Sequence, residues 1–137
     1  MSIKTTGMKY TIELSEEQMI IIAQCLEDVS RFAAGQYQLQ HTIYEMVKEL
    51  PFEEQTKRTD ESNEFLRQAK KVLLPEMIDN SSEGYNHTNF IGNTYQIYRT
   101  ILHQLAKDKN WKSVYSSPAI PSGNLGSIKI MRYGLLD

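Results

Sequence analysis

The first clear pattern along the chain is an alternation of apolar and polar residues over positions 8–14. Every second residue is apolar, so the apolar side chains share one face of an extended backbone, and this period predicts a half-buried strand. Ser15 then begins a helix, because Ser15 and Gln18 have capping-box spacing and two acidic residues follow the cap. Residues 1–7 are interpreted as a flexible leader.

A period of three to four residues follows and predicts a long amphipathic helix. Its first apolar positions are Met19, Ile22, Leu26, Val29 and Ala33. The period continues to Leu50, and Pro51 ends it because proline lacks an N–H and disfavours helix in the residue before it. The apolar face turns polar at Gly35 and Gln36. Two interpretations stay open there: a kink, or a place where another backbone or a ligand approaches.

The next segments differ in how clearly they are patterned. Residues 51–63 are charge-rich and fit either a loop or a solvated helix start, and residues 65–73 predict a shorter amphipathic helix. A second long helix is predicted from a cap at Asn86 or Thr88 to about Lys107. Its apolar positions are Ile91, Tyr95, Tyr98, Leu102 and Leu105.

Two further strands are predicted near the C-terminus, over 111–116 and 127–133. The chain is then a single domain over 1–137 with an α+β fold. A small antiparallel sheet of N- and C-terminal strands packs on two long helices and a shorter third helix. Such a sheet has open edges, which favour pairing between subunits.

Composition narrows the class of protein. A net charge of -2 argues against a binder of long nucleic acid, which carries a basic stripe. Cys25 is the only cysteine, which excludes an internal disulfide, and its apolar neighbours favour a buried residue over a reactive thiol. No secretion signal and no apolar run long enough for a membrane span is visible, so we expect a cytoplasmic location and no membrane partner.

Catalytic motifs are missing from the sequence. It has no HExxH, P-loop, GxSxG or paired-cysteine motif, so we expect no enzyme activity, no cofactor and no metal. A binding constellation remains. Helical spacing puts Gly92, Gln96, Arg99 and His103 along one side of the second long helix.

The first long helix repeats this arrangement with Arg31, Gly35 and Gln36. An arginine fork suits phosphate or carboxylate, while Phe90 offers a ring face and Asn93 an amide that reads base edges. A structural interpretation stays open for Arg31, which can pair with Glu27 or Asp28. Arg99 has no acidic residue three or four positions away.

Five short stretches carry a resemblance to a known family. Residues 13–18, 30–31, 35–36, 93–103 and 114–117 resemble the phage-encoded Thoeris anti-defence sponge family, within a likeness that covers 9–37 and 86–130. Members of that family bind cyclic ADP-ribose-type signals, and some bind cyclic oligonucleotides. They hold them uncleaved in pockets between subunits of a dimer or hexamer.

The resemblance implies specific roles. Arg31 and Arg99 match the phosphate-contacting arginines of the family, and Phe90 and Asn93 match its ring-stacking and base-reading positions. The third arginine of the family can be either Arg58 or Arg67. The chain is therefore expected to be a homo-oligomeric anti-defence protein that sequesters a cyclic nucleotide messenger in the host cytoplasm. The alternative is a phage accessory protein that inhibits a host protein by direct contact.

Overall fold

The computed structural model describes residues 7–78, 81–82 and 88–134. It contains four α-helices: α1 (Glu16–Ala33), α2 (Gln40–Val47), α3 (Phe52–Leu73) and α4 (Asn89–Lys109). One short 3-10 helix, η1 (Val114–Ser116), follows α4. Apart from Gly7, the predicted leader lies outside the described residues.

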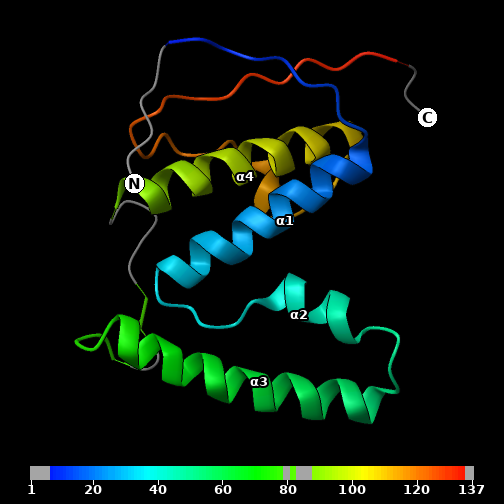
Figure 1. The fold of residues 1–137 in the computed structure, drawn as a ribbon. Helices are drawn as coiled ribbons and strands as arrows, with labels where there is room; N and C mark the ends of the chain where they lie inside the picture. Colours follow the sequence, from blue (N-terminus) through cyan, green and yellow to red (C-terminus); the bar gives the residue numbers. More distant parts are fainter. Residues whose placement is uncertain (1–6, 79–80, 83–87, 135–137) are drawn as a thin grey trace.

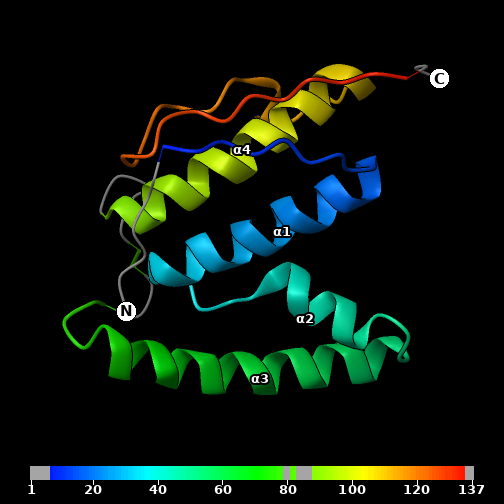
Figure 2. The same cartoon turned by 45° about the horizontal axis from the view of Figure 1, so that its top comes forward.

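The helices form a stack in the order α4, α1, α2 and α3, and two extended segments lie at the α4 end (Figure 1). α1 packs chiefly on α4, and α2 lies between α1 and α3. Figures 1 and 2 show α3 at one end of this stack and the extended segments beside α4 at the other. Within the described chain, the backbone of α3 packs against α2 and against no other helix.

The predicted α+β fold is wrong, because the described part of the chain holds no strand. Residues 8–14 and 127–133 are extended, but neither segment forms a main-chain ladder with described residues. Residues 111–116 do not form a strand either, since Ser113 caps η1 there. The alternating pattern predicts an extended backbone correctly, but a sheet also needs a neighbouring strand at hydrogen-bonding distance.

The predicted first long helix is two helices. α1 ends at Ala33, and Gly35 follows with a φ of 102°, a conformation that favours glycine. The Gln36 N–H donates to the Arg31 carbonyl at 2.8 Å, so the turn satisfies a carbonyl that the helix end leaves open. Gly35 therefore ends a helix instead of kinking one.

The later helices are close to their predicted positions. Of the two interpretations of residues 51–63, the solvated helix start is confirmed, because α3 begins at Phe52 and continues through the predicted helix over 65–73. Thr88 caps α4 by accepting a hydrogen bond from the Ile91 N–H, which confirms one of the two predicted caps. Asn110, in the left-handed region, ends α4. The apolar face of α4 is confirmed as core at Ile91, Tyr98, Leu102 and Leu105.

The face that α1 buries agrees only in part with the predicted one, because Met19 and Leu26 pack on the core as predicted. Ala23 lies in the core against Tyr98 and neighbouring residues of α4, while Ile22 and Val29 are exposed. Cys25 is also exposed, so its predicted burial is wrong. The buried face of α1 is rotated from the predicted apolar face, because Glu27 and other polar residues of α1 lie inward. The central cluster of buried apolar residues is Ala23, Tyr98, Ile101, Leu102 and Leu105.

No helix in the described residues is both long enough and apolar enough to cross a membrane.

Candidate functional site

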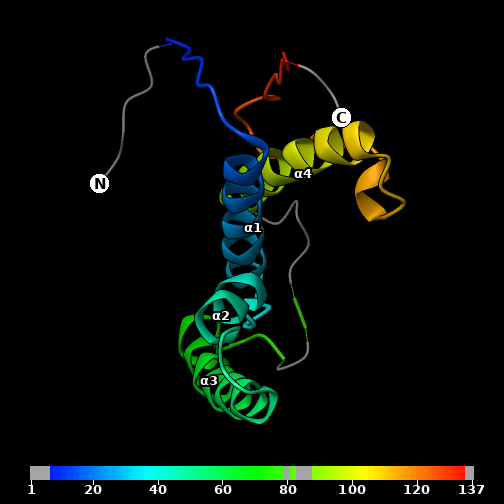
Figure 3. The ribbon, with the colours of Figure 1, turned by 90° about the vertical axis from the view of Figure 1, so that its right-hand side faces the viewer.

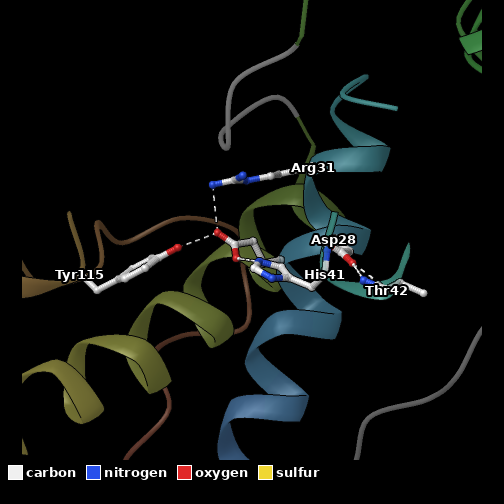
Figure 4. Close-up of polar contacts among 6 residues, drawn as sticks. Asp28, Arg31, His41, Thr42 and Tyr115 are labelled. Carbon is white, nitrogen blue, oxygen red and sulfur yellow. Dashed lines mark hydrogen bonds and ion pairs between the residues drawn. The ribbon is translucent and has the colours of Figure 1, made fainter. Parts of the chain in front are cut away.

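Glu27 is the centre of a buried polar network that joins three elements. Its side chain is 2% exposed, and its two oxygens meet groups from α1, α2 and η1. Oε2 accepts from Arg31 at 2.9 Å and from the Tyr115 hydroxyl at 2.8 Å, and Oε1 lies 2.6 Å from His41 Nε2. Figure 4 shows Arg31, His41 and Tyr115 converging on this carboxylate. The network stabilises the buried charge, which is costly without partners.

The environment of Glu27 changes the acidity of two tyrosines. Burial raises the pKa of Tyr115 to about 12, and the hydrogen bond to Glu27 and the charge of that carboxylate add to the effect. Burial also raises the pKa of Tyr98, and Glu27 adds to it while Arg31 opposes it. Both phenols are therefore held in the neutral form.

We expect the raised pKa of Tyr115 to appear in an alkaline titration. An unfolded tyrosine has a pKa of ~10, so the contribution of Tyr115 to stability is complete below that pH and is lost as pH rises toward about 12. Tyrosinate absorbance in the folded protein should show a late component that is smaller in Tyr115→Phe, in which Tyr98 keeps its raised pKa. An unchanged late component in that variant would contradict the assignment of the raised pKa to Tyr115.

Asp28, the neighbour of Glu27, attaches α2 to α1. Asp28 is 3% exposed and accepts from the His41 and Thr42 N–H groups at 3.2 and 2.7 Å. The Thr42 hydroxyl donates to the same carboxylate at 2.7 Å. α2 has no side-chain cap of its own at Leu39. Asp28 therefore supplies from α1 the cap that α2 lacks, and its negative charge suits the positive helix start.

The predicted polar side of α4 holds the C-terminal segment of the same chain. Gln96 Oε1 accepts from the Ser122 N–H at 3.1 Å, and His103 Nδ1 lies 2.9 Å from the Tyr115 carbonyl oxygen. Asn93 Oδ1 accepts from the N–H groups of Asn124 and Leu125 at 3.0 and 3.2 Å. These side chains come together as the spacing predicts, but their described partners belong to the C-terminal segment and are mostly main-chain groups, apart from the Asn124 side-chain oxygen that accepts from Asn93 Nδ2 at 3.0 Å.

Arg99 belongs to the same face and is also held by the chain. One terminal amino group donates to the carbonyls of Val114 and Ser117 at 3.1 and 3.3 Å. The guanidinium carbon lies 5.8 Å from the ring centre of Tyr95 and 5.2 Å from that of Tyr115. Ring faces attract a cation at this distance. Arg99 Nε is buried and has no hydrogen-bond partner among the described residues.

Gly92 has a packing role on this face. A Cβ at this position would fall on the backbone of Gly123 and Ser122, so only glycine lets the turn approach the helix. The same turn is the one that Asn93 and Gln96 hold. The polar interruption in α4 is thus a docking site for the 122–125 turn.

Arg31 and Gln36 lie at a different place, a cleft of about 430 Å³ between the end of α1, α2 and α3. Its lining is rich in amide side chains and holds one arginine. The lining residues are Asp28, Arg31, Gln36, Gln38, Gln40, Ile43, Tyr44, Val47, Gln55, Thr59 and Asn63.

Two residues of the cleft lining are relevant to ligand binding. Tyr44 is 58% exposed, so its ring is accessible. Asn63 Oδ1 is buried and has no hydrogen-bond partner among the described residues, which is costly unless something donates to it. Gln55, in contrast, already donates to the carbonyls of Lys48 and Leu50.

The predicted site residues therefore separate into three places. Arg31 and Gln36 line the cleft, Phe90 is 56% exposed at the start of α4, and the other four hold the C-terminal segment. Arg31 does pair with Glu27, as one interpretation allowed. Tyr44 and Asn63 of the cleft were not among the predicted site residues. The one signal for this cleft in the sequence is the cluster of glutamines over 36–40, just after a helix-ending glycine.

The described residues place no group of three His, Cys, Asp or Glu side chains around a point that could hold a metal ion.

No protein-family model, curated protein or solved structure matches this chain. The resemblance to the Thoeris anti-defence sponge family stays a prediction.

Proposed function

We propose that this protein binds a nucleotide-derived signalling molecule of the cyclic ADP-ribose or cyclic oligonucleotide class and holds it without cleaving it. The observation that carries the proposal is the cleft between α1, α2 and α3, about 430 Å³ in volume and lined by amides and one arginine. That volume is within the range of small-molecule sites.

The chemistry of the lining suits a nucleobase. A base edge presents donors beside acceptors, and an amide side chain presents one of each. Gln36, Gln38, Gln40 and Asn63 supply four such groups. The exposed ring of Tyr44 supplies a face for stacking, which tolerates any base.

Arg31 supplies the group for a phosphate. Its side chain is 41% exposed, and its ion pair with the buried Glu27 holds the guanidinium in place beside the cleft. A positioned guanidinium loses less freedom when it binds an anion than a mobile one. The charge of Arg31 is balanced by Glu27, so hydrogen bonds and stacking, more than net positive charge, support binding here.

We expect Tyr44→Ala to weaken ligand binding about tenfold, because stacking of one base on an aromatic ring contributes ~1–3 kcal/mol. Isothermal titration calorimetry with cyclic ADP-ribose isomers and cyclic di- and trinucleotides measures this effect. Met46→Ala is the matched control, since Met46 is on the same helix, is 77% exposed and does not line the cleft. Equal affinity in Tyr44→Ala and the wild type would contradict the proposed site.

Recovery of the ligand tests whether it is held or altered. The protein is equilibrated with the same panel, separated from free ligand, denatured by heat, and the released compound is identified by mass spectrometry. We expect an intact cyclic nucleotide. A cleaved product would overturn sequestration, and failure of every compound to bind would overturn the proposal as a whole.

A further inference from the structure

The extended segment 8–14 is exposed along its whole length. Tyr10 is 84% exposed, Ile12 74% and Met8 69%, although these residues are apolar and alternate regularly. None of them packs on the core, whereas Ile128 and Ile130 of the C-terminal segment do. Figure 3 shows the segment running away from the helices before α1 begins. The part of the chain that the structure describes therefore leaves this apolar face uncovered.

The main chain of residues 9–14 is open to pairing as well. Residues 9–14 make no main-chain hydrogen bond to another described residue before Ser15 caps α1. An extended chain with open N–H and C=O groups and alternating apolar side chains is a template for pairing with another strand. The remaining question is which strand its side chains fit.

The segment is complementary to itself. When two copies are paired antiparallel and centred on Thr11, Lys9 of one copy lies opposite Glu13 of the other, and Tyr10 lies opposite Ile12. Met8 then faces Leu14, and Thr11 faces a second Thr11. Every opposed pair is one that stabilises an antiparallel ladder: opposite charges, an aromatic with a β-branched residue, two apolar residues, or two threonines.

We propose that two copies of this chain dimerise through residues 8–14, paired antiparallel with a two-fold axis at Thr11. The contact is isologous, because each copy gives the same seven residues and receives the same seven. The Lys9 amino group of each copy pairs with the partner's Glu13. The apolar residues of both strands come to one face of the two-stranded ribbon.

The structure also provides a place for the apolar side chains of the partner strand, because residues 11–14 themselves form one wall of a groove. The groove, of about 490 Å³, lies between residues 11–16 and 130–134, with Met19 and Leu105 among its lining residues. A two-stranded ribbon is marginal alone and needs such a surface to pack on. The groove is at the start of α1, whereas the ligand cleft is at its end, so the dimer does not depend on the proposed function.

Charge reversal tests the register. We expect sedimentation to show a dimer for the wild type and a dissociation constant about 10- to 100-fold higher for Lys9→Glu, because two symmetry-related pairs change from attraction to repulsion. Glu13→Lys should weaken the dimer to the same extent. Lys57→Glu, an exposed charge reversal on α3, is the matched control and should leave the dissociation constant unchanged.

Restoration distinguishes this register from a general charge effect. An equimolar mixture of Lys9→Glu and Glu13→Lys should form a heterodimer, and the double variant should form a homodimer, each with near wild-type affinity. Circular dichroism checks that all variants keep their helices. A wild type that is monomeric at every concentration, or a Lys9→Glu variant with wild-type affinity, overturns the proposal. So does hydrogen-exchange protection of residues 9–13 that does not depend on protein concentration, since that marks pairing within one chain.

Discussion

Glu27→Leu is expected to lower the free energy of unfolding by about 3 kcal/mol. The substitution removes the acceptor shared by Arg31, His41 and Tyr115, and leaves the latter two with unsatisfied groups beside an apolar side chain. Loss of one member of a buried ion pair costs ~3–5 kcal/mol. The lower end applies here because Arg31 is 41% exposed and can be solvated again.

Chemical denaturation measures this change, and Glu27→Gln separates charge from shape. Glutamine keeps the volume and one acceptor oxygen, so a smaller loss of about 1–2 kcal/mol is expected. Glu49→Leu is the control, since Glu49 is exposed between α2 and α3, and should change stability by no more than ~0.5 kcal/mol. Wild-type stability in Glu27→Leu would show that the network contributes nothing. Hydrogen exchange should also speed up across α2, which Glu27 contacts through His41.

Gly92→Ala is expected to destabilise the protein by about 2 kcal/mol, the opposite of its usual effect within a helix. Alanine is favoured over glycine by ~1 kcal/mol at an unconstrained helical site. Here the new Cβ meets the backbone of Gly123 and Ser122, which cannot rotate away as a side chain can. The turn must move, and the hydrogen bonds to Asn93 and Gln96 are strained or lost.

Chemical denaturation of Gly92→Ala shows whether the substitution lowers or raises the free energy of unfolding. Lys107→Ala, at an exposed position of the same helix, is the control. Limited proteolysis within 117–126 should be faster in Gly92→Ala only. A double-mutant cycle with Asn93→Ala adds a further test, since both changes release the same turn and their effects should be less than additive. An increase in stability would mean that Gly92 is an ordinary helical glycine.

Local signals predicted much of the helical structure. The cap at Ser15 lies where the capping box places it, with both reciprocal hydrogen bonds formed. Thr88 caps α4, and the apolar face of α4 is buried as its period predicts. These features depend on residues within a few positions of one another, so a single sequence contains the information.

The candidate site was only partly predictable, because the partner of a polar side chain is not a local property. The intervals among Asn93, Gln96, Arg99 and His103 correctly place them on one face of α4. That this face meets main-chain groups of residues 114–125 depends on how the chain returns across the helix. In the same way, the sequence predicts that Glu27 can pair with Arg31, four positions away. The contacts of Glu27 with His41 and Tyr115 span 14 and 88 positions and are not a local property.

The sequence by itself determined the helix start at Ser15, the extended backbone of residues 8–14 and the grouping of polar residues on α4. It also narrowed the cap of α4 to Asn86 or Thr88, of which the structure has Thr88. Only the tertiary structure decided that α1 turns Glu27 inward, that Gly35 ends the helix, and that the extended segments form no ladder with described residues. The physical reason is the range of the interactions. Caps and helical periods act over one turn, whereas burial of a carboxylate and pairing of a strand require partners that are distant in the chain.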